Sequence, residues 1–446
     1  MTLSQITIVV AMLCFVAVGL FVKKSSMASY SVFTMSKGKL GWFTIAAGIS
    51  MTFAGGAAIL TTASVSYTFK WYSLVDPIAL MVGLLIVIFL YKKYKCDDGV
   101  TISDLLSSNY KGLTILIGIV TSFTFILIVA ANFVALSKLL HPYFPTIHPL
   151  LMTFVLSTLV FSYVFYGGFN SVTRTDMLQY VLITLFLVLP ILLFALSNNC
   201  HVATGRVAHE YVVMPTDYII LFSIPILFTP LSQDINLRIK SAKSTKAGKI
   251  GLMMGGVFYF TIALSAAYVG IYLGNNNIRL LDPEQAIPIF FKSNFTKWGF
   301  LAVIATLSAI VSTLDSYILN SITSISNDIF RPLARKEPNI PKTIKGAALT
   351  TYVIAVTIAL FFNKVLVLSL TSLLIYISVL IPVAFGNTLR LSGKKIFIAS
   401  FFNIVAVVFF EVMSCPISPK ALLYPAFGCS VITFLYFLNP STHEIH

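Results

Sequence analysis

The stretch AIVSTLDS, residues 309–316, lies inside a long apolar segment, GFLAVIATLSAIVSTLDSYILNSITSI, residues 299–325. It combines a carboxylate with several hydroxyl groups in surroundings that otherwise carry mostly aliphatic side chains. Spacings of three, four and seven residues put five polar side chains on one helical face: Ser308, Ser312, Asp315, Ser316 and Thr323. The segment therefore predicts a buried helix with a polar stripe directed at other parts of the protein.

The composition of the whole chain indicates the solvent in which it folds. Of its 446 residues, 58% are apolar and only 10% are charged, which is typical of a polytopic all-α membrane protein. The net charge of +15 comes from basic residues distributed between apolar segments, which favours topology signals over nucleic-acid binding. The five cysteines lack CxxC or metal-ligand spacing, so they predict neither a disulfide framework nor a zinc site.

Apolar windows of roughly 20 residues predict about thirteen transmembrane helices. The first is followed at once by Lys23 and Lys24 and has no small-residue cleavage site, so we do not expect a signal peptide. The predicted spans are 3–22, 41–69, 73–91, 113–137, 149–166, 175–197, 216–231, 250–273, 298–326, 346–363, 366–389, 396–414 and 421–438.

The basic residues predict the orientation of these spans. With the N-terminus outside and the C-terminus in the cytoplasm, 22 of the 30 Lys and Arg residues fall in inner loops, as the positive-inside rule requires. We therefore expect a multi-pass protein of the cell membrane. All six histidines fall in predicted outer loops or the C-terminal tail, which leaves no histidine proton relay inside the membrane.

Two predicted spans, the second and the seventh, carry helix-breaking residues: Gly48, Gly55, Gly56, Pro225 and Pro230. Either the glycines permit close packing and the prolines kink continuous helices, or both helices are interrupted and expose backbone groups to a cavity. The matched placement of the two helices in the chain favours interruption.

Each interrupted span opens a block of five spans, residues 41–197 and residues 216–390. Because five is odd, the two blocks run in opposite orientations, which is the pattern of an inverted-repeat transporter. Residues 1–40 add one helix and an inner loop before them, and residues 391–446 add two helices and a tail.

The carboxylate of Asp315 needs a compensating partner. An ionised aspartate at the centre of a membrane helix costs roughly 2.5–3.5 kcal/mol, whereas one interhelical hydrogen bond recovers about 0.6 kcal/mol. No Lys or Arg lies in the predicted helix cores, so a bound cation such as Na+, which prefers oxygen ligands, is one interpretation. The alternative is a protonated aspartate, or one hydrated near a helix end.

Three other polar positions allow two interpretations each. Asp176 is either a helix-start carboxylate beside Arg174 or an acid inside the membrane, and Asp76 is either a helix cap before Pro77 or a wall of a solute pocket. The inner end of the seventh span is either a gate network or a solvated helix end: Gln233, Asp234 and Arg238.

Four segments, in this order, resemble the sodium:solute symporter family. They are SYSVFTMSKGKLGWF before the second span, YGGFNSVTRTDMLQ at residues 166–179, QDINLR at residues 233–238, and AIVSTLDS with its downstream Asn327, Asp328 and Ile329. The third segment has Asn236 next to the place where the family usually has a second glutamine. The resemblance covers most of the chain and implies a leucine-transporter-type fold with ten core helices in two inverted repeats.

The resemblance also implies sites. The sodium site shared by the family carries over to the backbone carbonyls of Met51, Ala54 and Ala309 and to the side chains of Ser312 and Thr313. In some members a second sodium ion is bound, which here would involve these four residues: Asp176, Ser312, Asp315 and Ser316. Gln233 and Arg238 are the expected gate residues.

Candidate solute-binding residues are Gly55, Ala58, Asp76 and Phe228. The polar side chains that sugar- and proline-carrying members place in the broken second span are replaced here by Phe53, Gly55, Gly56 and Ala58. This departure favours a smaller or less polar solute.

These features predict a secondary active transporter that couples the symport of a small organic solute to Na+ by alternating access. Its partners would be the solute, sodium and the lipid bilayer, without nucleic acid. The alternative is a proton-coupled symporter of the same fold that uses Asp315 and Asp176. We do not expect an enzyme, because neither HExxH nor GxSxG occurs in the sequence.

Overall fold

The computed structural model describes residues 3–20, 33–35, 38–96, 99–107, 113–197, 224–295, 298–334, 339–362, 364–388 and 393–413. Throughout these ranges the regular structure is helical, and the single extended pairing is an isolated bridge between Leu40 and Ala242. The predicted all-α fold is therefore confirmed.

The helices of the first half of the chain are α1 Leu3–Leu20, α3 Trp42–Phe53, α4 Gly56–Phe69, α5 Val75–Phe89, α6 Tyr91–Cys96, α7 Ile102–Leu106, α8 Thr114–Leu140, α9 Pro149–Ile183 and α10 Leu189–Ser197. Those of the second half are α12 Pro225–Phe228, α13 Gln233–Ser241, α14 Thr245–Asn275, α15 Ala286–Asn294, α16 Gly299–Ser324, α17 Arg331–Leu333, α18 Ile340–Phe361, α19 Val365–Thr388 and α20 Gly393–Met413. Two π-helical turns join neighbouring helices, η3 Thr184–Val188 after α9 and η6 Ile325–Phe330 after α16.

The second predicted span is interrupted as expected. Helix α3 ends at Phe53 and α4 begins at Gly56, because Ala54 (ψ 31°) and Gly55 (ψ 162°) leave the helical conformation. The glycines also allow close packing on α16: a Cβ on Gly55 would lie 2.3 Å from the Thr313 hydroxyl oxygen, and one on Gly56 1.7 Å from Ile310. These glycines therefore serve both purposes: they lie at the interruption of the helix, and they permit its close packing on α16.

The seventh predicted span is described only from Ile224 onward, and this part is also interrupted. Helix α12 passes into the short 3₁₀ turn η4, Thr229–Leu231, and Ser232 is extended (φ −68°, ψ 126°) before α13 begins. The chain thus enters α13 after a break, and α13 is buried along its whole length.

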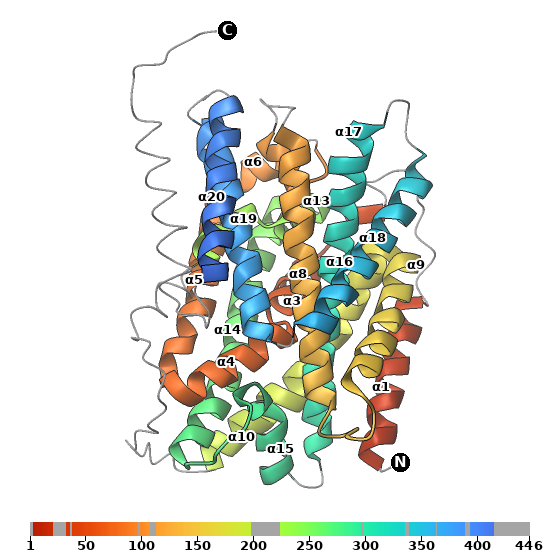
Figure 1. The fold of residues 1–446 in the computed structure, drawn as a ribbon. Helices are drawn as coiled ribbons and strands as arrows, with labels where there is room; N and C mark the ends of the chain where they lie inside the picture. The colour runs from red at the N-terminus through yellow and green to blue at the C-terminus, as the bar shows by residue number, and fades with distance from the viewer. Residues whose placement is uncertain are drawn as a thin grey trace.

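Helix α16 lies at the centre of the bundle (Figure 1). It packs against α8 and α9, while α14 packs against both α3 and α4, α19 packs against α8, and α1 packs against α9. Every residue of α16 from Ala302 to Ser324 is buried. The polar stripe predicted for this helix is therefore enclosed by protein.

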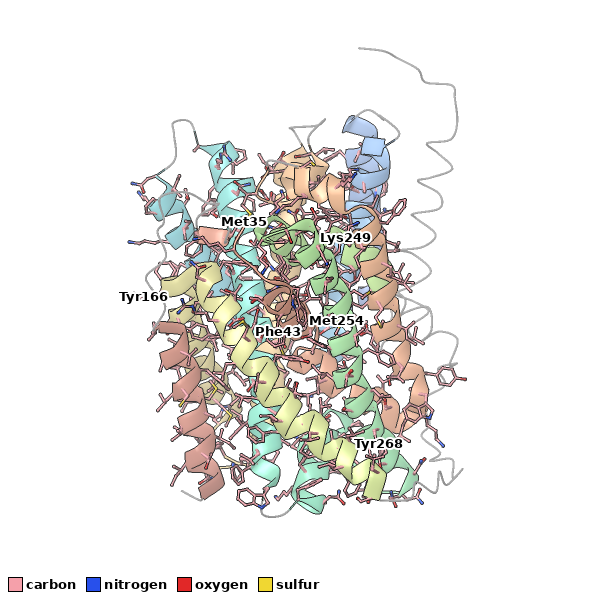
Figure 2. All side chains as sticks on the ribbon, turned by 180° about the vertical axis from the view of Figure 1, so that it is seen from behind. Met35, Phe43, Tyr166, Lys249, Met254 and Tyr268 are labelled. Carbon is pink, nitrogen blue, oxygen red and sulfur yellow. The ribbon has the colours of Figure 1, made fainter. Side chains whose placement is uncertain are left out.

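The fifth and sixth predicted spans form one run, residues 149–197, that consists of two helical segments separated by a kink at Gly168. Helices α9 and α10 are joined through η3, and the irregular point lies at Gly168 (φ 54°, ψ −147°). Figure 2 shows the second part of this run crossing the bundle diagonally, from near Tyr166 at one end, past Phe43, towards Tyr268. The second part of the run thus begins earlier than residue 175, the predicted start of the sixth span.

Seven helices within the described ranges are long and apolar enough to cross a membrane, and three shorter apolar helices accompany them. The exterior carries large exposed apolar side chains, among them Leu85, Phe89, Leu193, Phe361 and Phe402, as a lipid-facing surface requires. The structure is that of a multi-pass membrane protein. The predicted span 421–438 lies outside the described residues.

Candidate ion and solute site

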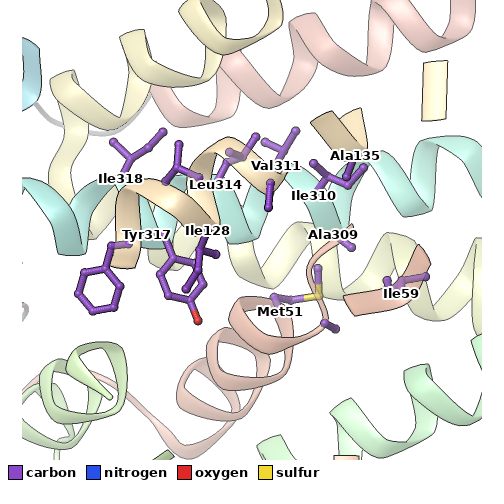
Figure 3. Packing of buried hydrophobic residues seen from close by; sticks show 14 of the residues in the cluster. Met51, Ile59, Ile128, Ala135, Ala309, Ile310, Val311, Leu314, Tyr317 and Ile318 are labelled. Atoms are coloured by element: carbon purple, nitrogen blue, oxygen red, sulfur yellow. The ribbon is translucent and has the colours of Figure 1, made fainter. Parts of the chain in front are cut away.

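Oxygen atoms from α3 and α16 converge where α3 ends. The hydroxyl oxygen of Thr313 lies 3.0 Å from the carbonyl oxygen of Met51, 3.3 Å from that of Thr52 and 3.1 Å from that of Ala309. All four residues are buried, and Figure 3 shows Met51 beside Ala309. We call these four oxygens the Thr313 oxygen cluster.

The Thr313 oxygen cluster has more acceptors than hydrogens. One hydroxyl carries one hydrogen, so it satisfies one of the three carbonyls at a time, and the last carbonyls of α3 lack partners along the ended helix. Neutral oxygens at close range are the ligands that a hard cation prefers. The structure thus brings together three of the expected sodium ligands, Met51, Ala309 and Thr313.

The other two expected ligands are placed differently. Ala54 lies in the break between α3 and α4 and is fully buried, and its N–H donates to the carbonyl of Ser50. The hydroxyl of Ser312 donates to Oδ1 of Asp176. Ser312 is therefore turned towards a neighbouring group of charged residues.

Those charged residues surround Arg238, whose side chain is fully buried. Its Nε donates to Asp234 Oδ2 at 2.8 Å, and its Nη2 donates to Asp176 Oδ2 at 3.0 Å and to the Thr52 hydroxyl at 3.0 Å. The Ser316 hydroxyl lies 3.4 Å from the same Nη2. We call these five residues the Arg238 network.

The Arg238 network overturns one expectation and separates the alternatives at two other positions. A basic residue does lie in the core of the helix bundle, Asp176 pairs with Arg238 while Arg174 is exposed, and the inner end of the seventh span is a buried network, not a solvated helix end. Asp176 also lies two turns inside the helical segment that follows Gly168, so it is not at a helix start.

The path of the chain explains the burial of Arg238. The break at Ser232 turns α13 inward, and the guanidinium then reaches α3 beside Gly48, where a Cβ would lie 1.7 Å from Nη1. No side chain larger than glycine leaves room for the guanidinium at that point. The ring of Phe169 covers another side, with its centroid 5.9 Å from the Cζ of Arg238.

Asp315, the residue that raised the question of a cation, is satisfied on one side only. Its Oδ2 accepts hydrogen bonds from the Tyr163 hydroxyl at 2.9 Å and the Thr175 hydroxyl at 3.0 Å. Its Oδ1 is buried and has no hydrogen-bond partner among the described residues. Of the four residues expected at a second sodium site, Asp176, Ser312 and Ser316 thus contact one another or Arg238, and Asp315 is held by hydroxyl groups.

A cavity of about 120 Å³ lies beside the α3–α4 break. All four candidate solute-binding residues line it: Gly55, Ala58, Asp76 and Phe228. Thr52 and Thr313 line it too, so the Thr313 oxygen cluster and the cavity share a wall. Drug-sized ligands occupy pockets of roughly 300–1,000 Å³, which makes this cavity suitable for a much smaller solute.

Asp76 is a wall of this cavity and not a helix cap. It stands in the first turn of α5, where no side-chain cap hydrogen bond is formed, and its Oδ2 accepts a 2.5 Å hydrogen bond from the hydroxyl of Tyr259 on α14. Tyr259 is buried and also lines the cavity.

Gln233 and Arg238, the expected gate residues, serve separate contacts. Gln233 Oε1 accepts from the backbone N–H of Ile102 on α7 at 2.6 Å, whereas Arg238 binds Asp176 and Asp234. Lys95 donates to three carbonyls near the end of α13, those of Ile239, Lys240 and Ala242. In the described part of the chain, polar contacts therefore tie α13 to α6 and α7.

The end of the bundle that carries α6 also contains a buried tyrosine contact. The Tyr94 hydroxyl donates to the carbonyl of Pro230 just before the second break, and burial raises the pKa of Tyr94 to about 12. The phenol therefore stays protonated, and remains a donor, at every physiological pH.

Sequence reasoning missed several residues of these sites. Tyr163 and Thr175 hold Asp315, and Asn132 and Tyr259 line the cavity. Asn132 carried a usable signal, since it is the only amide side chain in the apolar helix α8. The partners of Asp315 carried none, because they lie 140 or more residues away in the chain.

Known proteins resemble this chain in sequence and in fold. The sequence profile of the Sodium:solute symporter family matches residues 33–388. The osmoregulated proline transporter OpuE of Bacillus subtilis (strain 168) is 26% identical over 285 residues, which cover 58% of this chain and 56% of OpuE. The chain thus matches little more than half the length of that relative.

Solved structures share the fold. A Na+-coupled sialic acid symporter, in a substrate-bound outward-open state, gives a TM-score of 0.75 at 14% identity over 100% of both chains. Mhp1, a nucleobase-cation-symport-1 family transporter with bromovinylhydantoin bound, gives 0.59 at 12% identity over 92% of this chain and 95% of Mhp1. The predicted leucine-transporter-type architecture is thereby confirmed. With its profile match across most of the sequence, the chain belongs to the sodium:solute symporter family.

Proposed function

We propose that this protein is a secondary active transporter that couples the inward movement of Na+ to that of a small organic solute. The observation that carries the proposal is the Thr313 oxygen cluster. It holds three carbonyl oxygens within 3.0–3.3 Å of one hydroxyl at a helix break. The solute would occupy the cavity on the other side of the same break.

The wall that the Thr313 oxygen cluster shares with the cavity would couple sodium binding to solute binding. A sodium ion among the oxygens of Met51, Ala309 and Thr313 would fix the end of α3 to α16, and this fixes the shape of the cavity wall formed by Thr52 and Gly55. By thermodynamic reciprocity, the solute then tightens sodium binding by the same factor. A membrane potential contributes about 2.3 kcal/mol per charge per 100 mV, which is enough to concentrate a neutral or cationic solute.

In this proposal residues 41–197 and 216–390 are the two inverted repeats, each of which begins with one of the broken helices. The N-terminus lies outside and the C-terminus in the cytoplasm. The end that carries α6, α13 and α17 in Figure 1 then faces the cytoplasm, and its polar contacts close the cytoplasmic path. Gln233 and Arg238 take part in this closure.

Arg238 supports one sodium ion over two. Three of the four residues of the expected second site already contact one another or the guanidinium. We therefore propose the Thr313 oxygen cluster as the site of the coupling ion. Ala54 and Ser312 would join it only after small rearrangements, and Ser312 would first release Asp176.

The second candidate function is proton-coupled symport with the same fold. It is favoured by one observation, that Oδ1 of Asp315 has no hydrogen-bond partner among the described residues, since a proton would convert this oxygen to a hydroxyl group. Asp176 is less suited to this role, because it is bound by Arg238 and Ser312.

Binding of radioactive 22Na+ to the purified protein separates the two functions. We expect saturable binding that Thr313→Ala weakens at least tenfold and that Thr313→Ser largely retains, because serine keeps the hydroxyl. Thr357→Ala is the matched control, since the Thr357 hydroxyl contacts only its own helix at an exposed position. Undiminished 22Na+ binding in Thr313→Ala would refute the site, and uptake that responds to pH but not to sodium would establish the proton-coupled alternative.

A further inference from the structure

The charged side chains that line the cavity are of one sign only, which is negative. Asp76 supplies a carboxylate to the wall, and none of the described residues that line the cavity is Lys, Arg or His. Arg238, the basic residue of the core, has its guanidinium directed to Asp176 and Asp234 and does not line the cavity. The carboxylate of Asp76 would repel an anionic solute, and no cationic side chain of the described lining would offset that repulsion, whereas a positive group would find a partner.

Asp76 lacks a basic partner of its own. Within the described residues it forms no salt bridge, and the Tyr259 hydroxyl is the one side chain that donates to it. An ionised carboxylate accepts up to about four hydrogen bonds, and leaving such a charge uncompensated in a low-dielectric site is costly. The carboxylate of Asp76 therefore favours a cationic ligand. That cation would either donate hydrogen bonds to the carboxylate or carry a diffuse positive charge.

Aromatic rings adjoin this carboxylate. Phe53 lies edge-on to Phe228, with ring centroids 6.5 Å apart, and its centroid is also 6.5 Å from that of Tyr259. Tyr317 lines the cavity as well. The rings come from four different helical elements, which gives the cavity several aromatic walls. Ring faces attract organic cations within about 6 Å of their centroids.

The remaining walls limit the chemistry of that cation. Leu80, Ile128, Leu370 and Leu373 make them largely apolar, so a small metal ion would find too few oxygen ligands near Asp76. A polyhydroxylated solute would have to pair its hydroxyl groups with the polar minority of the wall, which includes Thr61, Thr62, Asn132 and Ser369. A weakly hydrated nitrogen cation with a compact apolar body satisfies both the carboxylate and the rings.

We infer that the solute carries a cationic nitrogen, an ammonium or alkylammonium group, that pairs with Asp76 between the rings of Phe53, Phe228 and Tyr259. The inference rests on the proposed function, because it assigns the solute of the same cavity. The cationic group belongs either to a simple organic cation or to a zwitterion, and these two sources are separated by the probes below.

The test compares nitrogen compounds with their carbon isosteres. Choline is compared with 3,3-dimethylbutan-1-ol, and glycine betaine with 3,3-dimethylbutanoate, while tetramethylammonium, ethanolamine and L-proline extend the range of nitrogen probes. Binding to the purified protein is measured by thermal shift and by calorimetry in NaCl and in KCl. We expect at least one nitrogen probe to bind ten times or more tighter than the isosteres, and to bind tighter in NaCl.

Variants of the site identify Asp76 as the partner. We expect Asp76→Asn to weaken the nitrogen probe at least tenfold, to the level of its isostere, and Asp76→Glu to recover part of the loss. Phe228→Leu, which removes one ring, is expected to weaken a quaternary probe three- to tenfold. If choline binds and glycine betaine does not, the solute is a simple cation, and the reverse result indicates a zwitterion.

The inference is overturned if isosteres bind as well as the nitrogen probes, if no nitrogen probe binds to protein that binds 22Na+, or if Asp76→Asn binds them like the unmodified protein. Failure of the proposed function looks different. In that case 22Na+ binding is absent or is insensitive to Thr313→Ala, whatever the nitrogen probes do.

Discussion

Two helices of this protein are interrupted, and the two interruptions bring different chemical groups together. At the α3–α4 break, main-chain carbonyls are directed to a neutral hydroxyl and the wall of a cavity. At the α12–α13 break, the chain turns into the core and delivers a guanidinium to two carboxylates. The first break leaves oxygen lone pairs available to a ligand, whereas in the second the charges compensate one another. The polar groups left uncompensated are thus those of the first break, which is where we propose the ion and solute sites.

The largest effect is expected from removing the charge at the second break. Arg238→Met leaves Asp176 and Asp234 buried without their cation, and breaking a buried ion pair in this way costs roughly 3–5 kcal/mol. We expect a large fall in the thermal unfolding temperature and in the yield of folded protein. The triple variant Arg238→Met with Asp176→Asn and Asp234→Asn removes the charges together, and a triple variant no more stable than Arg238→Met would argue against charge as the cause.

A steric change at the first break comes next. Gly56→Val adds a Cβ that would lie 1.7 Å from the Cγ1 of Ile310, and overpacking of this kind costs about 1–3 kcal/mol. Because α4 must then move away from α16, we expect 22Na+ affinity to fall together with stability. Ile310→Ala in the same protein makes room for the new side chain. If the pair of changes restores neither property, the close contact is not what matters at this break.

Ser312 tests the difference between the two breaks, because it lies between the Thr313 oxygen cluster and the Arg238 network. Its hydroxyl donates to the carboxylate of Asp176, and a hydrogen bond to a charged group is worth about 1.5–3 kcal/mol. We expect Ser312→Ala to lower stability by about this amount while weakening 22Na+ binding less than Thr313→Ala does. Equal losses of sodium affinity in the two variants would show that Ser312 belongs to the ion site.

The smallest effect on sodium binding is expected at Gln233. Gln233→Ala leaves the backbone N–H of Ile102 without its side-chain acceptor, which costs about 1–3 kcal/mol in a buried setting. The loss falls on the contact between α13 and α7, so we expect easier opening of that end and little change in sodium affinity. Labelling of a cysteine introduced at Ser103, a buried position on α7, reports the opening. Unchanged labelling would mean that this contact does not hold the end closed.

The sequence predicted those features that depend on residues near one another in the chain. It did not predict features that depend on how the chain turns in space. Hydropathy and the Gly55–Gly56 pair predict the interrupted second span, and the AIVSTLDS stretch predicts a polar stripe that is in fact buried. The segment QDINLRIKS, in contrast, has the composition of a solvated helix end, and only the turn at Ser232 carries it into the core.

The same distinction applies within the candidate sites. Asp76 could be identified as a cap or a pocket wall from its neighbours in the chain, and the choice required Tyr259, 183 residues away. The position of the kink at Gly168 depends on a positive φ, which hydropathy does not report. Single residues with uncertain roles were therefore recognised, but their partners were not.

The Thr313 hydroxyl has a consequence for the speed of ion capture. Its oxygen lies 3.0 Å from a carbonyl oxygen of α3 and 3.1 Å from a carbonyl oxygen of α16. At the proposed site, a sodium ion could use this oxygen once the O–H rotates away, which is a local motion, whereas helix rearrangements take microseconds to milliseconds. We therefore expect sodium to equilibrate with its site far faster than the helices rearrange, so that slow turnover reflects the protein scaffold and not the ion.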